Sequence, residues 1–272
     1  MTMYKSERIS EHITRITDIA GVACYLIEGK EKSCLLDTCC GYGNLKEYVS
    51  TLAQREPFVI LTHGHYDHTG SAALFDEVYM NHLDLPVLHK HNSERAEFLA
   101  ADKKQIPALK NIQMADLNPL LKKEPLPLKD GDTFDLGNLH LRMYLVPGHT
   151  PGMMCALIPE EKTIFFGDAC GMNVLLHDEY ASSVSEYRSS LVRLKTMESE
   201  YTHIYRNHGT YTNDKNLLDN VLESCELILK HEDDHWPVQM YGKTLYAAKK
   251  TECCKRTDGK EGNLIYAPEK AN

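Results

Sequence analysis

The sequence lacks the features of a membrane-spanning, secreted or nucleic-acid-binding protein. No apolar stretch approaches the ~20 residues needed to cross a bilayer, and the N-terminus has no uninterrupted apolar run before a small-residue cleavage site. Lys and Arg number 30 against 39 Asp and Glu, so the formal net charge is -9. This balance leaves no basic footprint for a phosphate backbone. We therefore expect no membrane and no nucleic acid among the partners.

The nine cysteines form no recognisable framework. Their number is odd and no C-x-x-C occurs, so neither a disulfide scaffold nor a zinc ribbon is indicated. The adjacent pairs Cys39-Cys40 and Cys253-Cys254 are poorly placed to bridge each other. Free thiols suit a reducing compartment, and we expect a cytoplasmic protein. Cys170 is expected to be a buried structural thiol.

The composition is that of a globular protein large enough to bury a substantial core. Hydrophobic residues make up 42% and charged residues 25% of the 272 residues, and both values are ordinary. Short apolar runs and helical patterns alternate without a repeat, a low-complexity tract or a linker, which predicts one α/β domain over 1–272. Expected strands cover 21–28, 33–37, 58–62, parts of 133–168, 202–206 and two late runs near 243–248 and 263–268. Expected helices cover about 44–54, 184–197 and 214–232, and another is expected to open between Gly70 and Phe75.

Residues 80–128 differ in character from the rest of the chain. They are rich in charge, contain several prolines and show helical patches. We predict a helical insertion here, a kind of segment that often shapes a substrate pocket. Its three histidines, His82, His89 and His91, are expected on a solvated or hydrogen-bonded surface rather than at a third metal site.

The strongest signal follows the expected apolar strand 58–62. Four potential metal ligands, His63, His65, Asp67 and His68, fall within six residues. On a helix, residues i and i+2 lie about 200° apart, whereas an extended segment places His63, His65 and Asp67 on one face. His68 joins them only if the chain turns there. A ligand set rich in imidazole with one carboxylate suits zinc, iron or a similar first-row metal.

Three further candidates follow other apolar, strand-like runs. His149, Asp168 and His208 each stand beside a glycine. Any one alone would be a weak signal, because such residues are common in turns. Four ligands would fill one tetrahedral site, so these additional residues raise the prospect of a second metal.

The four motifs, in this order, resemble the metallo-β-lactamase superfamily. T-H-x-H-x-D-H-x-G begins at Thr62, P-G-H-T-x-G contains His149, F-x-G-D ends at Asp168, and a G-H-G-like motif surrounds His208. The resemblance extends from residue 15 to about 212 and implies a four-layer αββα sandwich with metals at one edge of the two sheets. An early Asp37-Thr38 matches the family's D-T-G element, with Cys39 in place of glycine.

The resemblance also implies how the ligands are shared. One metal would be held by three histidines, His63, His65 and His149. A second would be held by Asp67, His68 and His208, with Asp168 bridging both. We expect two divalent ions, with Zn favoured and Fe or Mn as alternatives. Asp37 is expected either to accept the N–H of a ligand histidine or to stabilise a turn.

Two such metals would activate a shared water, so the sequence predicts a metal-dependent hydrolase that uses a metal-bridging hydroxide as its nucleophile. Asp67 is the predicted catalytic residue, because a carboxylate there could orient that water or transfer its proton. The expected substrate is a small-molecule ester, thioester or lactone, since glyoxalase II and lactonase-like members of the family share the ligand set. A phosphodiesterase and a di-iron redox or oxygen-handling protein remain alternatives. The sequence is compatible with a homo-oligomer.

Overall fold

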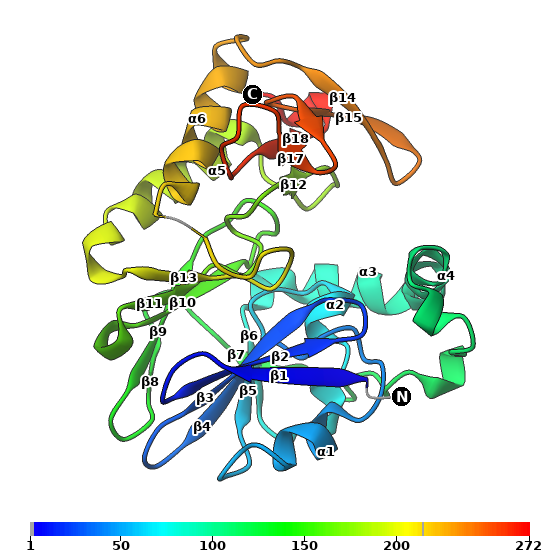
Figure 1. Ribbon diagram of the computed structural model, residues 1–272, viewed down its shortest axis with the longest axis vertical. Coiled ribbons are helices and arrows are strands. Elements are labelled where there is room, and N and C mark those ends of the chain that lie inside the picture. The colour runs from blue at the N-terminus through cyan, green and yellow to red at the C-terminus, as the bar shows by residue number, and fades with distance from the viewer. Residues whose placement is uncertain (1–2, 214) are drawn as a thin grey trace. The chain divides into compact units, whose positions relative to one another are not determined.

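The computed structural model describes residues 3–213 and 215–272 and divides into two compact units, Met1–Leu141 and Arg142–Asn272. Both units combine β-sheet with helices (Figure 1). The predicted α/β class is therefore confirmed. That the chain is one domain stays a prediction, and each unit is described by itself below.

The first unit is built on a seven-stranded sheet whose strands lie side by side in chain order. Its strands are β1 (Tyr4–Arg8), β2 (Ile13–Asp18), β3 (Ala23–Glu28), β4 (Ser33–Leu36), β5 (Phe58–Ile60), β6 (Val78–Met80) and β7 (Leu126–Pro127). The first four pair antiparallel, and β4 to β7 pair in parallel. The parallel part ends in loops at its carboxyl edge, which is where the first histidine motif lies.

Helix α1 (Leu45–Ser50) covers part of this sheet. Asn44 caps its start by accepting the N–H of Glu47, and Leu45 and Val49 pack with strand residues such as Leu35. The helix is shorter than the expected 44–54. Nevertheless, the N–H groups of residues 52 and 53 still bond to the carbonyl of Val49, so the chain remains turned there.

Helices occupy part of the segment 80–128. It contains α3 (Leu85–Ser93) and α4 (Arg95–Gln105) with short 3₁₀ turns around them. That it is an insertion relative to other family members stays a prediction. Strand β8 (Thr133–Asp135) follows it, and the division between the units falls within β9 (His140–Leu145).

The second unit contains two larger sheets and a small hairpin. Strands β9, β10 (Met154–Ile158), β11 (Thr163–Phe165) and β13 (His203–Tyr205) belong to one sheet. The other has the order β12 (Val174–Leu176), β18 (Leu264–Tyr266), β15 (Lys243–Ala247) and β14 (Trp236–Met240). The hairpin pairs β16 (Thr251–Glu252) with β17 (Lys255–Arg256). The two late strands were predicted, whereas β12 and β14 were not.

Helices α5 (Val184–Lys195) and α6 (Leu217–Leu229) fill the core of this unit. Their buried faces, which include Tyr187 and Val221, pack in one cluster with residues of both sheets. The start expected for the second helix, residue 214, lies outside the described residues.

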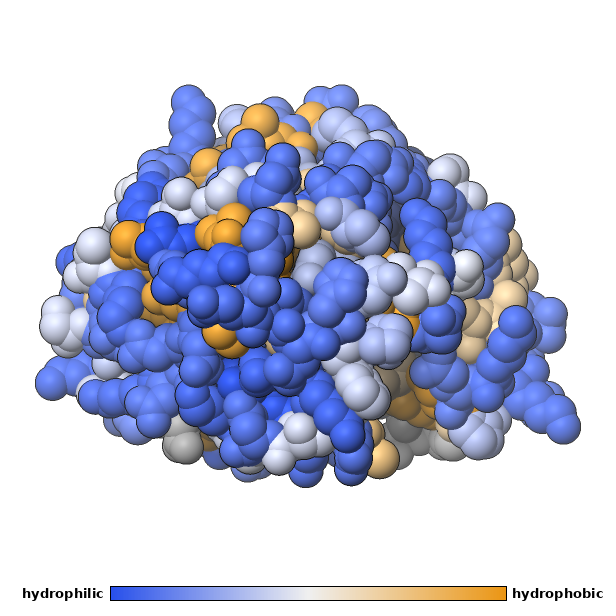
Figure 2. Space-filling model, turned by 90° about the horizontal axis from the view of Figure 1, so that it is seen from above, coloured by the Kyte–Doolittle hydropathy of each residue, from blue (hydrophilic) through white to orange (hydrophobic). Residues whose placement is uncertain are grey.

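No helix in the described part of the chain is long and apolar enough to cross a membrane. The face in Figure 2 carries mostly hydrophilic residues, with apolar residues in small separate patches. Such scattered apolar exposure is normal for a protein surface in contact with water.

Candidate metal-binding residues

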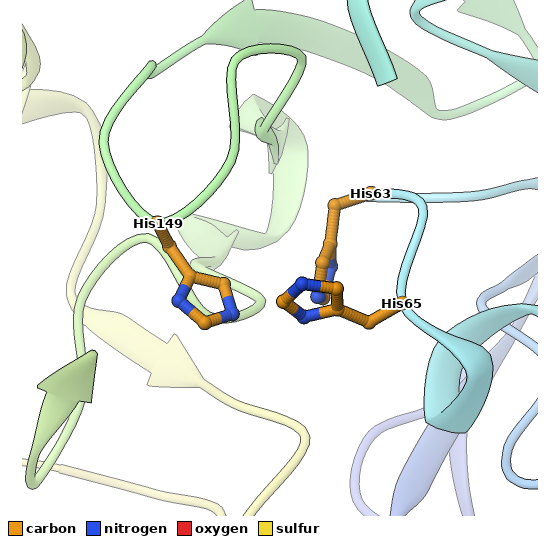
Figure 3. A group of neighbouring side chains, drawn as sticks. All are labelled: His63, His65 and His149. Carbon is orange, nitrogen blue, oxygen red and sulfur yellow. The ribbon is translucent and has the colours of Figure 1, made fainter. Parts of the chain in front are cut away.

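The first histidine motif lies on the loop after β5, in the first unit. Figure 3 shows His63 and His65 on this loop, and His149 on a separate loop that belongs to the second unit. The chain turns earlier than the sequence predicted. Helix α2 (Tyr66–Thr69) begins directly after His65, whose carbonyl accepts the N–H groups of residues 68 and 69. Asp67 and His68 therefore lie on a helical turn, and the helix expected between Gly70 and Phe75 is only a 3₁₀ turn.

The four predicted ligands of this unit converge. The ring centroid of His63 lies 4.6 Å from that of His65 and 4.0 Å from that of His68. The Oδ2 atom of Asp67 lies 3.7 Å from the Nε2 atom of His68. All three histidines are buried. Burial of so many polar groups is costly unless they are hydrogen-bonded or bind a metal.

Asp37 fixes the conformation of this loop by accepting hydrogen bonds from it. It is fully buried and accepts three hydrogen bonds: from the Thr62 N–H at 2.7 Å, the Thr62 hydroxyl at 2.8 Å and the His68 Nδ1 at 2.9 Å. Because the Thr62 proton goes to Asp37, the hydroxyl oxygen is left to accept from His63 Nδ1 at 3.0 Å. One carboxylate thus orients two of the predicted ligands, as expected of a group behind a metal site.

Two residues of the turn after β4 have a left-handed backbone conformation. Asp37 has φ 64° and Cys39 has φ 56°. Aspartate tolerates this region better than most residues, and glycine adopts it freely. Cys39, which occupies the position of the family's glycine, therefore keeps the conformation that glycine would favour.

In the second unit, three strand ends bring His149, Asp168 and His208 together. Strands β9 and β11 are both antiparallel to β10, and β13 is parallel to β11. These three strands therefore end at the same edge of the sheet. The Oδ2 atom of Asp168 lies 3.7 Å from His149 Nε2 and 3.5 Å from His208 Nε2.

The loops that carry these residues are tightly supported. His149 Nδ1 donates to the Leu175 carbonyl at 2.8 Å. A Cβ atom on Gly148 would lie 2.1 Å from the ring of Tyr187, so only glycine fits there. The Tyr187 hydroxyl donates to the Ala169 carbonyl at 2.6 Å, beside Asp168. Cys170 is buried in the core cluster of this unit, and burial raises the pKa of its thiol, as expected of a structural cysteine.

These residues fit metal ions. Hydrogen bonds engage the Nδ1 atoms of His63, His68 and His149, so coordination would use Nε2. Two ligands around one tetrahedral zinc, each bonded at about 2.0–2.1 Å, lie about 3.4 Å apart. The carboxylate–imidazole separations of 3.5–3.7 Å match this spacing and exceed a normal hydrogen bond.

Two contacts near the first loop were not predicted from the sequence. Asp84 Oδ2 accepts the N–H of Gly64 at 2.8 Å. His91 is hydrogen-bonded, as one of the two expectations for it had it, and its ring also stacks on His65 at 4.2 Å, a contact that was not expected. Both come from the helical segment 80–128, and no local pattern in the sequence links them to the motif.

Comparisons with known proteins agree with the motifs. A family profile described as the metallo-beta-lactamase superfamily matches residues 18–204. The acyl-coenzyme A thioesterase MBLAC2 of Bos taurus is 27% identical over 183 residues, which are 62% of this chain and 66% of that protein. The chain thus spans just under two thirds of this relative. The probable polyketide biosynthesis zinc-dependent hydrolase PksB of Bacillus subtilis is 28% identical over 68% of this chain and 72% of its own length.

Among solved structures, a metallo-beta-lactamase from Pontibacter korlensis aligns with a TM-score of 0.58 and 18% identity. The alignment covers 82% of this chain and 99% of that one. This likeness shows the fold, so the predicted fold family is confirmed. Because the family profile also matches well over half of the residues, the chain belongs to the metallo-β-lactamase superfamily.

Proposed function

We propose that the chain is a dinuclear metal-dependent hydrolase of small-molecule esters, thioesters or lactones. Under this proposal the ligands from the two units act together. His63, His65 and His149 would hold one ion, and Asp67, His68 and His208 would hold the other. Asp168 would be shared between them.

The observation that carries the proposal is the position of the Asp168 carboxylate. One oxygen, Oδ2, lies at ligand–ligand distance from both His149 and His208, which the proposal assigns to different ions. A carboxylate between two such imidazoles is the arrangement expected of a bridging ligand. Asp37 supports the same interpretation, because it fixes two histidines of the other unit in orientations suited to Nε2 coordination.

Divalent ions at these residues would supply a Lewis acid and lower the pKa of a bound water. Asp67 is the residue that would handle the proton of this water. Its side chain is 22% exposed, so it is open to solvent while held on α2 beside His68. A carboxylate in this position would orient the attacking water and pass its proton to the leaving group.

The substrate class is supported by the named relatives. One is named as an acyl-coenzyme A thioesterase and another as a zinc-dependent hydrolase. Esters, thioesters and lactones all present a carbonyl that a metal can polarise. The predicted chemistry requires no serine or cysteine nucleophile.

The test combines metal analysis with a substrate screen. Mass spectrometry of the purified protein should give about two metal ions per chain. Hydrolysis is then measured on an acyl-coenzyme A thioester, an aliphatic lactone and a phosphodiester. Asp67→Ala should lower kcat on the preferred substrate by about 10²–10⁴-fold, with the folded state retained by circular dichroism.

Asp76→Ala is the matched control, because the Asp76 carboxylate is 94% exposed in the same unit. It should behave like the wild type. Full activity of Asp67→Ala would refute the mechanism. A preference for the phosphodiester would favour the phosphodiesterase alternative, and iron with a redox-active spectrum but no hydrolysis would favour the di-iron alternative.

A further inference from the structure

Helices α3 and α4 contact the loop after β5, which carries His63 and His65, at several points. An added Cβ on Gly64 would lie 2.8 Å from the carbonyl oxygen of Asp84 and 2.8 Å from the nitrogen of Leu88, so the start of α3 packs directly on the loop. The Asp84 side chain also accepts the Gly64 N–H. The loop is therefore fixed to the helical segment at Gly64, the residue between His63 and His65.

The next point of contact is an aromatic stack. The ring of His91, on α3, lies almost parallel to that of His65, with centroids 4.2 Å apart and an interplanar angle of 16°. Phe98, on α4, lies 4.7 Å from His91 and stacks on Tyr66 at 4.3 Å and 8°. The rings of His91 and Phe98 thus pack against His65 and its neighbour Tyr66, His91 on His65 and Phe98 on Tyr66.

Hydrogen bonds hold this stack in register. His91 Nδ1 accepts the backbone N–H of Tyr66 at 3.3 Å. The Tyr66 hydroxyl donates to Asp102 Oδ2 at 2.8 Å, and the Tyr42 hydroxyl donates to the same atom at 2.6 Å. Tyr66 is therefore anchored to α4, and His91 is anchored to Tyr66.

We propose that His91 is a positioning residue for the metal ligand His65, and that it acts by holding the plane of the His65 ring through stacking. This inference rests on the proposed metal-binding role of His65. Hydrogen bonds donated by Nδ1 orient His63 and His68. The flat ring of His91 adds a constraint of another kind on His65, because stacking restricts rotation about the Cβ–Cγ bond of His65.

Two substitutions separate the stack from the hydrogen bond. His91→Phe keeps a flat ring over His65 but loses the acceptor for the Tyr66 N–H. His91→Asn keeps an acceptor at the position of Nδ1 but loses the ring. His89→Ala is the control, since His89 is exposed on the same helix. Zinc affinity of each folded protein is measured by competition with a chromophoric chelator, and the stability of the metal-free protein by urea unfolding.

We expect His91→Asn to weaken zinc binding at one site about tenfold, the lower end of the range for groups that orient metal ligands. His91→Phe should stay within about threefold of the wild type, and His89→Ala should match it. A merely structural role would lower the stability of the metal-free protein while leaving the zinc affinity of the folded protein unchanged. Wild-type affinity in His91→Asn, or an equal loss in His91→Phe, would overturn the inference.

His65→Ala distinguishes this failure from failure of the proposed function. If the wild type binds no metal, or if His65→Ala binds it equally well, the proposed site is wrong. If zinc binding depends on His65 but not on His91, only the positioning role is wrong.

Discussion

Asp37 shows how one buried residue can determine the chemistry of several others. It accepts two hydrogen bonds from Thr62 and one from His68, and it is fully buried. A carboxylate accepts at both oxygens, which is why a single side chain can satisfy three donors. If an amide nitrogen replaced either oxygen, its N–H group would face a donor of Thr62 or His68.

We therefore predict that Asp37→Asn impairs both metal binding and folding. Metal affinity should fall about 10–100-fold, because His68 loses the group that orients it. The free energy of unfolding should fall by about 1–3 kcal/mol, since a buried donor loses its acceptor. Chelator competition and urea unfolding measure the two effects, with Asp76→Asn at the exposed surface as control. Unchanged metal affinity would show that Asp37 only stabilises the turn.

Four of the seven candidate ligands could be picked out from the sequence because each follows an apolar strand. His63, His149, Asp168 and His208 all follow such runs, and strands of one direction end at one edge of a sheet. Asp84 and His91 could not be found in this way. Their contacts with Gly64 and His65 join residues that lie 20 or more positions apart, through packing of helices whose placement no local pattern encodes.

At the scale of secondary structure, boundaries and short strands were the least predictable features. Helix α2 begins at Tyr66 because its first turn is closed onto the His65 carbonyl, a choice that the extended ligand pattern did not reveal. Strand β14 contains Pro237 and is largely exposed, and a proline within a short run argues against a strand when only the sequence is considered. It exists because it pairs with β15 along five residues.

Arg256 links several elements of the second unit. Its guanidinium is 1% exposed and donates to Glu223 on α6 at 3.0 Å, to Asp258 at 2.5 Å and to the Gly262 carbonyl at 2.8 Å. The hydrogen bond from Arg256 lowers the pKa of Asp258. Hydrogen bonds from Lys260 and Arg256 outweigh burial and lower the pKa of Glu223. Hairpin β16–β17 is thereby tied to α6 and to the loop before β18.

We predict that Arg256→Met destabilises the protein in a pH-dependent way. A carboxylate whose pKa is lowered by folding contributes stability above its unfolded pKa, about 3.9 for Asp and 4.3 for Glu, and this is lost as the pH falls through the folded value. At pH 7 the free energy of unfolding should fall by about 2 kcal/mol in the variant. Breaking a fully buried pair costs about 3–5 kcal/mol, and the loss here is smaller because solvent screens both carboxylates. The difference should shrink below pH 4.

Urea unfolding of the wild type and the variant between pH 3 and 7 measures this effect. Lys255→Met, which removes a charge from the exposed side of the same hairpin, is the control and should change stability little at any pH. A constant difference between Arg256→Met and the wild type across this range would mean that lost packing, rather than the two ion pairs, is responsible.

For the whole molecule, the proposed function requires ions to link residues of the first and second units. An ion that binds only the folded state stabilises it by RT ln(1 + [M]/Kd), about 2.7 kcal/mol at 100 times the Kd. If each ion takes ligands from both units, binding makes both units more resistant to unfolding. If one unit binds an ion alone, only that unit becomes more resistant.

The single tryptophan makes this distinction measurable. Trp236 lies on β14 of the second unit, paired with β15 and 4.8 Å below the Lys250 ammonium group, so its fluorescence reports the unfolding of that sheet. Zinc should shift the fluorescence transition to higher urea, and a chelator should reverse the shift. We predict that His63→Ala, a change in the first unit, removes most of the zinc-dependent shift seen by Trp236, whereas His82→Ala leaves it intact. A full shift in His63→Ala would show that the second unit binds zinc without the first, contrary to the shared site.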